Sequence, residues 1–347
     1  MQNESKRDDA AAPRRARARI EVARAIWYVK PGVAEIRSAR LTPPGPGEAR
    51  VRMLYSGISR GTERLVALGE VGESERTRMR APLQDGEFPF PVKYGYCAVG
   101  RIEAGPAERL GETVFCLHPH QDVFNAPLGM LAQVPAGIPA KRATLAANME
   151  TALNALWDSG AGPGDRIVVV GAGVVGLMVA SLAARLPGAD VMVVDVAAER
   201  RVLVERLGAA FLEAPRAAEL SGSADVVFHT SVTAGGLATA ISTAGREGTI
   251  VELSWYGDKA VAAPLGGAFH SQRLRLISSQ VGQVSPGRRP RWDYARRMGK
   301  ALELLADARL DALVAEELAF DAAPRELPAV LAGTMGGLAP VIAYGTP

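Results

Sequence analysis

The feature that most constrains this chain is a run of three glycines set between two apolar segments. The run is Gly171-x-Gly173-x-x-Gly176, preceded by the β-branched segment 166–170 and followed by the apolar segment 174–186. These flanks predict a buried strand and then a helix. In that setting the first glycine permits a tight turn, the second lets a ligand approach the backbone, and the third allows the helix to pack closely on the strand.

The next predicted strand extends this pattern to a dinucleotide-binding site. It covers 191–195 and ends in Asp195, about 20 residues after the last glycine, where a carboxylate accepts hydrogen bonds from ribose hydroxyls. The N–H groups of Val174 and Val175, at the start of the helix, would face a pyrophosphate. Because a carboxylate repels a 2′-phosphate, we predict NAD as cofactor, and Arg200 leaves NADP as the alternative. A helix packed on a strand without a ligand is the structural alternative.

The second half of the chain alternates between strands and helices, which predicts a parallel sheet covered on both faces. Strands are predicted at 166–170, 191–195, 225–229, 248–253 and 274–280, and helices at 143–159, 174–186, 198–207, 237–244 and 294–306. The first half predicts short strands separated by glycine and proline, at 25–29, 33–37, 51–55, 92–103, 112–117 and 129–134. The fold class is therefore α/β with a mostly-β part.

Composition excludes several classes of protein. Two cysteines in 347 residues cannot form a disulfide framework or a four-cysteine zinc site. A net charge of +3 and 5% aromatic residues give no sign of a nucleic-acid partner. The uncharged stretch 167–184 is long enough to span a membrane, but the strand and helix predicted there explain it better. Residues 1–24 lack the apolar core of a secretory signal, so we expect a flexible arm on a cytoplasmic protein.

Several further motifs resemble the medium-chain dehydrogenase/reductase superfamily, of the zinc-type alcohol dehydrogenase kind. They are PGE at 46–48, SGISRGTE at 56–63, GYCAVG at 95–100, GETVF at 111–115, and Thr151. The resemblance implies a GroES-like catalytic domain at 25–149, completed by 287–347, around a Rossmann domain at 150–286. It also implies a homodimer, and a contact of Thr151 with the nicotinamide; Thr151 bonding to its own helix backbone is the alternative.

A closer similarity is to the branch that contains the bacteriochlorophyllide hydroxyethyl dehydrogenase. It rests on SGISRGTE at 56–63, LHPHQ at 117–121, NMETA at 148–152 and SQVG at 279–282.

The chain departs from this family at the catalytic zinc. Where zinc-dependent members supply a cysteine, this sequence has Ser59, and their Gly-His-Glu has become Gly-Tyr96-Cys97. A hydroxyl and a phenol are poor neutral ligands for Zn²⁺, so we expect the usual site to be absent. A displaced site made of Cys97, Glu150 and His118 or His120 is the alternative.

Without a metal, hydrogen-bond donors must polarise the substrate oxygen during hydride transfer. By resemblance, Tyr96 lies near the nicotinamide, and Ser59 and Thr62 are hydroxyls in the loop that carries the first zinc ligand of the family. His118 and His120 are candidates for a proton relay. The alternatives are a tyrosine that fills the core and histidines that only belong to a loop. Both cysteines, Cys97 and Cys116, equally suit small buried positions.

One basic cluster lies outside these motifs. It surrounds Trp292 and consists of Arg288, Arg289, Arg291, Arg296 and Arg297. It would suit an acidic substrate, or else a solvated surface or subunit contact.

Three functions remain open at this point. The first is an NAD(P)-dependent oxidoreductase that transfers hydride between the nicotinamide and an alcohol or ketone, as a medium-chain alcohol dehydrogenase/reductase does. The second is a zinc-free quinone or enoyl reductase. The third, motivated by the missing zinc ligands, is a non-catalytic NAD-binding protein.

Overall fold

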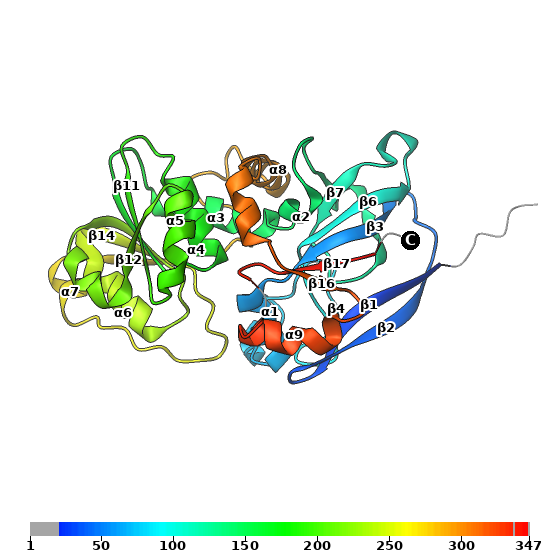
Figure 1. The fold of residues 1–347 in the computed structure, drawn as a ribbon, viewed down its shortest axis with the longest axis horizontal. Coiled ribbons are helices and arrows are strands. Elements are labelled where there is room, and N and C mark those ends of the chain that lie inside the picture. Colours follow the sequence, from blue (N-terminus) through cyan, green and yellow to red (C-terminus); the bar gives the residue numbers. More distant parts are fainter. Residues whose placement is uncertain (1–20, 336, 346–347) are drawn as a thin grey trace, which may run out of the picture.

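The computed structural model describes residues 21–335 and 337–345. Figure 1 shows a parallel sheet at one end of the molecule, mostly antiparallel sheets at the other, and α3 (Ala146–Ser159) and α8 (Tyr294–Leu304) between them. Residues 1–20 of the expected arm lie outside the description. Residues 21–24 are not arm, because strand β1 begins at Glu21 and pairs with β2 over its whole length, with Ala23 buried.

The predicted parallel sheet is present, with strand order β12-β11-β10-β13-β14-β15. Its strands are β10 (Arg166–Val170), β11 (Asp190–Asp195), β12 (Ala210–Glu213), β13 (Ala224–His229), β14 (Ala244–Glu252) and β15 (Arg275–Ser278). All neighbouring pairs are parallel. The order reverses between β10 and β13, and ligands of such sheets bind in the crevice outside the carboxyl ends at this point.

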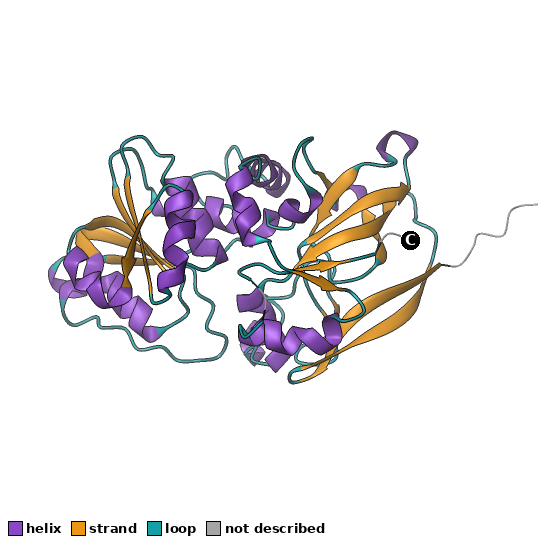
Figure 2. Ribbon diagram, in the orientation of Figure 1, coloured by secondary structure: helices purple, strands orange, loops and turns teal. Residues whose placement is uncertain are grey.

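Helices cover both faces of this sheet, as Figure 2 shows. Alternate residues of β10 point to opposite faces: Ile167 and Val169 join the core formed with α3 and α4, and Val168 and Val170 join the core formed with α6. The helices of this part are α4 (Val174–Ala183), α5 (Arg201–Arg206), α6 (Ala234–Thr243) and α7 (Ala268–Ser271). The uncharged stretch 167–184 is thus divided between β10 and α4. Within the described residues, no helix is both long and apolar enough to cross a bilayer.

The mostly-β part contains two sheets, and the end of the chain completes one of them. β17 pairs antiparallel with β3, so Val341 lies opposite Gly57. The strands are β1 (Glu21–Lys30), β2 (Val33–Leu41), β3 (Glu48–Gly57), β4 (Asp85–Gly86), β5 (Val92–Lys93), β6 (Ala98–Ala104), β7 (Thr113–Cys116), β8 (Val123–Pro127), β9 (Ala132–Gln133), β16 (Glu317–Ala319) and β17 (Val341–Ala343). The domain boundaries predicted at 149/150 and 286/287 stay predictions.

Several elements differ from the sequence prediction. The strand expected at 92–103 is two strands, because Gly95 has φ +124° and turns the chain between β5 and β6. The strand expected at 129–134 is a 3-10 turn followed by the short β9. The helix expected at 143–159 is divided into α2 (Ala140–Ala143) and α3. Sequence patterns also missed the helices α1 (Arg60–Leu68) and α9 (Ala323–Ala332) and the strands β4, β8, β12, β16 and β17.

The predicted arginine cluster is split between surface and interior. Arg288 and Arg296 lie over the rings of Trp157 and Trp292, at 5.3 and 4.0 Å from the ring centres. Arg297, on α8, is instead buried: its Nε donates to Glu150 at 3.0 Å, and its Nη1 donates to Asn154 at 2.6 Å. For Arg297 the expectation of a solvated or subunit-contact residue is wrong, because this guanidinium holds α8 to α3.

We expect the substitution Arg297→Met to lower the free energy of unfolding by about 3–5 kcal/mol, since it leaves the buried Glu150 carboxylate without its partner. Urea denaturation measures the change. Arg325→Met, at an exposed position of α9, is the matched control and should change stability by less than about 0.5 kcal/mol. A loss no larger at Arg297 than at Arg325 would contradict the assignment.

Candidate active site

The glycine run forms a tightly closed turn between β10 and α4. Gly171 has φ +111°, a conformation that side chains rarely adopt. A Cβ atom added to Gly176 would lie 2.0 Å from the carbonyl oxygen of Gly171, so the third glycine is required by close packing. Thr230, after β13, donates to the same oxygen at 2.9 Å. The turn is therefore held from both sides of the switch point.

Asp195 is half-buried at the carboxyl end of β11 and reaches across to this turn. Its carboxylate accepts the N–H groups of Ala172, at 2.5 Å, and Ala197, at 2.8 Å. Each bond uses a different oxygen, so both oxygens retain a free lone pair for a further donor. The predicted ribose-binding carboxylate thus also ties the glycine turn to the second strand.

Two guanidinium groups, those of Arg60 in α1 and of Arg200 in the turn after β11, approach each other. Arg60, in the first turn of α1, has its pKa lowered by burial and by the charge of Arg200. Its Nε is buried and has no hydrogen-bond partner among the described residues, although one Nη donates to Gly337 O at 2.5 Å. Two cations in this position favour an anion between them.

Three hydroxyl residues named from the sequence come together at the start of α1. The Tyr96 hydroxyl donates to Ser59 Oγ at 2.5 Å, and Thr62 also contacts the Tyr96 hydroxyl. Burial, followed by the nearby Cys97, raises the pKa of Tyr96 well above its ordinary value. The phenol therefore stays protonated at neutral pH, and the pair can donate hydrogen bonds to an oxygen but cannot act as a base.

A buried carboxylate that sequence patterns missed supports this pair from behind. Glu63 is fully buried, and its Oε1 accepts the backbone N–H of Ser59 at 2.7 Å. Its other oxygen lies 2.9 Å from His120 Nε2 and 3.2 Å from the Tyr28 hydroxyl, which donates to it. Glu63 stands four residues after Ser59 in one helix, and that spacing is the signal that could have revealed it.

The chain of buried polar contacts continues away from the site. His120 Nδ1 lies 2.7 Å from Ser56 Oγ, which in turn lies 2.9 Å from the Tyr344 hydroxyl. His120 is thus enclosed by protein groups on both ring nitrogens. Its geometry is that of a residue that positions Glu63, and through it Ser59.

His118 and Thr151 both make contacts within the protein, as expected for a loop histidine and for a threonine bonded to its own helix. His118 stacks on Phe124, with ring centres 3.7 Å apart, and its Nδ1 lies 2.9 Å from the Pro119 carbonyl oxygen. Burial lowers the pKa of His118 to about 3, so its imidazole is neutral at physiological pH. Thr151 donates to Ala147 O, one turn back in its own helix, at 3.0 Å. A relay through His118 stays a prediction.

The donor set near Ser59 does not fit a zinc ion. Glu150, the one carboxylate expected there, is engaged by Arg297. Burial raises the pKa of the Cys97 thiol, which opposes formation of the thiolate that zinc needs. Among the described residues, no three histidine, cysteine, aspartate or glutamate side chains gather as a metal site would require. We therefore derive no step through zinc.

Known proteins resemble this chain in both sequence and fold. The family model for the alanine dehydrogenase/PNT C-terminal domain matches residues 157–251. D-guloside 3-dehydrogenase of Escherichia coli is 28% identical over 190 residues, which are 52% of this chain and 54% of that protein. The chain thus spans about half the length of the curated relatives it matches.

Solved structures match over nearly the whole chain. A zinc-binding dehydrogenase, described as putative, from Sinorhizobium meliloti bound to NADP has a TM-score of 0.74 at 18% identity, and covers 93% of this chain and 99% of its own. L-idonate 5-dehydrogenase from Escherichia coli has a TM-score of 0.75 at 14% identity, with the same coverage.

The chain shares its fold with these dehydrogenase structures. The expected α/β class, with a GroES-like part and a Rossmann sheet, is confirmed. The closer similarity to the bacteriochlorophyllide dehydrogenase branch stays a prediction.

Proposed function

We propose that this protein is an NAD(P)-dependent oxidoreductase that transfers hydride between the nicotinamide and an alcohol or ketone. The observation that carries the proposal is the glycine turn tied to Asp195, with a pair of hydroxyl donors held at the start of α1. The end of α1 meets the loop after β14: Lys259 contacts Glu70 at 3.2 Å, and a Cβ added to Gly257 would lie 2.6 Å from Glu70 O. These contacts, together with the approach of Arg60 to Arg200, support a position of α1 beside the carboxyl edge of the parallel sheet.

The chemistry divides between cofactor and protein. A bound nicotinamide dinucleotide supplies or accepts hydride at C4. The N–H groups of Val174 and Val175 at the start of α4, the glycine turn, and the cations Arg60 and Arg200 favour its phosphates. Ser59 Oγ accepts a hydrogen bond from the Tyr96 hydroxyl, so the hydrogen of the Ser59 hydroxyl can be donated to the substrate oxygen. This donation polarises the carbonyl as hydride arrives, without a metal.

The proposal extends to cofactor preference, substrate and assembly. The free lone pairs of Asp195 suit ribose hydroxyls, which favours NAD, while Arg200 beside Arg60 keeps NADP open.

The relatives named for sugar derivatives suggest a small polyhydroxy alcohol or ketone as the substrate. A homodimer rests on the family resemblance alone, and a cytoplasmic location stays a prediction. Because the side chains near Ser59 do not suit a zinc ion, a zinc-free quinone or enoyl reductase is a second candidate.

Substituting Ser59→Ala or Tyr96→Phe tests the proposed chemistry. We expect kcat to fall about 10²-fold with either, because an oxygen loses a preorganised donor, while NADH affinity stays unchanged. Steady-state kinetics and NADH fluorescence titration give the two quantities. Tyr94→Phe, which removes the hydroxyl of the buried neighbour of Tyr96, is the control and should retain wild-type kcat. If all three variants retain it, the pair does not polarise the substrate.

The cofactor preference is tested by Asp195→Ala. We expect NADH affinity to fall about tenfold and NADPH affinity to fall less, because only NADH offers the adenosine 2′-hydroxyl to the carboxylate. The control is Asp190→Ala, at the opposite end of β11. Equal losses for both cofactors would assign Asp195 to the turn alone.

Metal content is a separate test. Protein purified without chelator should contain far less than one zinc per chain, and EDTA should leave its activity unchanged, because the donor set does not fit the ion. Elemental analysis decides this. Near-stoichiometric zinc, lost together with activity on chelation, would return the site to metal-assisted chemistry.

A further inference from the structure

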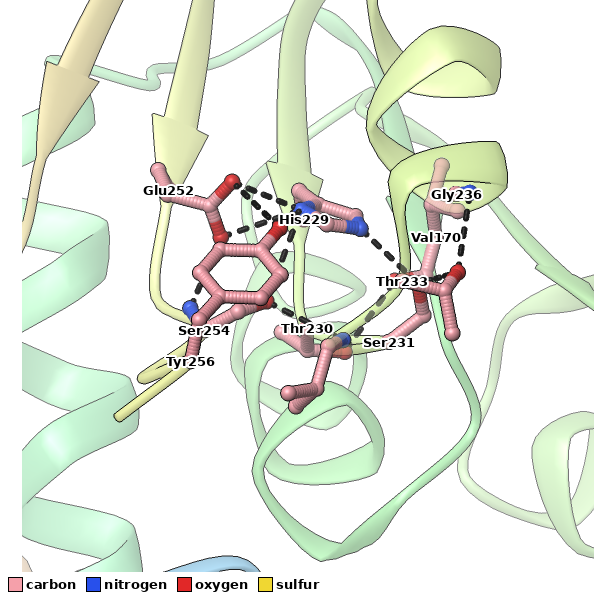
Figure 3. Close-up of polar contacts among 10 residues, drawn as sticks. Val170, His229, Thr230, Ser231, Thr233, Gly236, Glu252, Ser254 and Tyr256 are labelled. Carbon is pink, nitrogen blue, oxygen red and sulfur yellow. Dashed lines mark hydrogen bonds and ion pairs between the residues drawn. The ribbon is translucent and has the colours of Figure 1, made fainter. Parts of the chain in front are cut away.

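A second polar cluster, which the hydroxyl pair does not use, lies at the carboxyl edge of the parallel sheet. His229 is the last residue of β13, and Glu252 is the last residue of β14. These neighbouring parallel strands are in register, with His229 opposite Glu252. Figure 3 shows the two side chains meeting just beyond the strand ends, with Ser231 on the far side of the imidazole.

The imidazole is held through both of its nitrogens. His229 is fully buried; its Nδ1 lies 2.8 and 3.0 Å from the two oxygens of Glu252, and its Nε2 lies 2.8 Å from Ser231 Oγ. Ser231 is half-buried and lies 3.1 Å from the exposed Thr233. The order serine, histidine, carboxylate is the arrangement in which a base takes a proton from a hydroxyl while the acid orients it.

The charge on Glu252 determines which ring nitrogen of His229 can accept a hydrogen bond. Burial alone would raise the pKa of Glu252, but the contacts with His229 and with Ser254 outweigh it, so the pKa lies below its ordinary value. The ionised carboxylate accepts from Nδ1–H, so when the imidazole carries no second proton its Nε2 is the acceptor for the Ser231 hydroxyl.

Residues of the loop after β14, of strand β10 and of helix α6 surround the His229 imidazole. Loop residues after β14 bring Tyr256, whose hydroxyl lies 3.4 Å from Nδ1 and whose pKa is raised to about 12 by burial and by Glu252. The neighbouring strand β10 contributes Val170, which pairs with His229. Helix α6 contributes Gly236, where an added Cβ would lie 1.9 Å from Ser231 Oγ and 2.8 Å from His229 Nε2. Among these described neighbours, Glu252 and Tyr256 are the titratable groups.

The strand order places this cluster at one particular end of the cofactor. A dinucleotide lies across the switch point between β10 and β13, with its adenosine half on the side of the ribose-binding carboxylate. That carboxylate is Asp195, on β11. The nicotinamide half therefore falls on the side of β13 and β14, where His229 and Glu252 lie.

We propose that His229 takes up the proton that alcohol oxidation releases, with Ser231 as its link to the cleft. This inference rests on the proposed function. The C–H bond of the alcohol breaks with its electron pair, which the oxidised dinucleotide accepts, and the O–H proton must leave. Ser231 passes its own hydroxyl proton to Nε2 and takes up the released one, so that a carbonyl product and an imidazolium–carboxylate pair result.

The net charge of the His229–Glu252 pair allows proton uptake by His229 to be measured from the binding of NAD⁺ and NADH, without turnover. With neutral His229 the pair carries −1, and with protonated His229 it carries zero. Oxidised nicotinamide is a cation and reduced nicotinamide is neutral, so the deprotonated pair favours NAD⁺. Binding of NAD⁺ should therefore expel a proton from His229, and binding of NADH should not.

The test is calorimetric titration of the whole protein with NAD⁺ and with NADH, in two buffers of different ionisation enthalpy near pH 6.5. We expect NAD⁺ to release a fraction of a proton per chain that NADH does not release. Between pH 5.5 and pH 7.5 the affinity for NAD⁺ relative to NADH should rise about fivefold, since one linked proton allows at most tenfold per pH unit.

Three variants locate the effect. His229→Gln should abolish the difference in proton release. Glu252→Gln should diminish it near pH 6.5, because the imidazolium loses its carboxylate partner, and the exposed His270→Gln should leave it unchanged. The wild-type titration stands by itself if a variant fails to fold. Binding of both dinucleotides with equal proton release, or a difference that persists in His229→Gln, overturns the inference while the proposed function survives. If neither dinucleotide binds, the proposed function fails and the inference fails with it.

Discussion

The site depends on the contact between one carboxylate and one turn. Asp195 ends the second strand of the parallel sheet and holds the N–H of Ala172, inside the glycine turn that ends the first. Because Gly176 lies against the Gly171 carbonyl, the turn can take no side chain at either position, and α4 begins in direct contact with the sheet. The N-terminus of α4, the ribose-binding carboxylate and the carboxyl ends of β13 and β14 are thereby fixed relative to one another.

In the mechanism that we propose, two separate groups of residues divide the chemistry. Ser59, which contacts both Tyr96 and Glu63, would donate a hydrogen bond to the substrate oxygen. His229, paired with Glu252, would take up the proton. The first group comes from the β-rich part and the second from the parallel sheet, so the proposed reaction needs residues of both parts.

Sequence patterns predicted the parallel sheet well, because its strands are apolar runs and each helix follows at regular spacing; β10 begins and ends where expected. They failed where contacts join distant segments. Nothing local announces that Arg297 pairs with Glu150 from 147 positions away. Among the site residues, the hydroxyl cluster was predicted only through a family resemblance. The His229–Glu252 pair was missed, although two polar residues ending adjacent parallel strands are a detectable signal.

The most direct test of the account is hydride transfer by chelator-treated protein. Secondary alcohols and polyols are supplied with NAD⁺, ketones, quinones and enals with NADH, and the change in nicotinamide absorbance is followed. We expect turnover of an alcohol–ketone pair at a rate that added zinc does not increase. Tight binding of NADH with no turnover of any of these substrates would contradict it and leave a protein that binds the cofactor without using it.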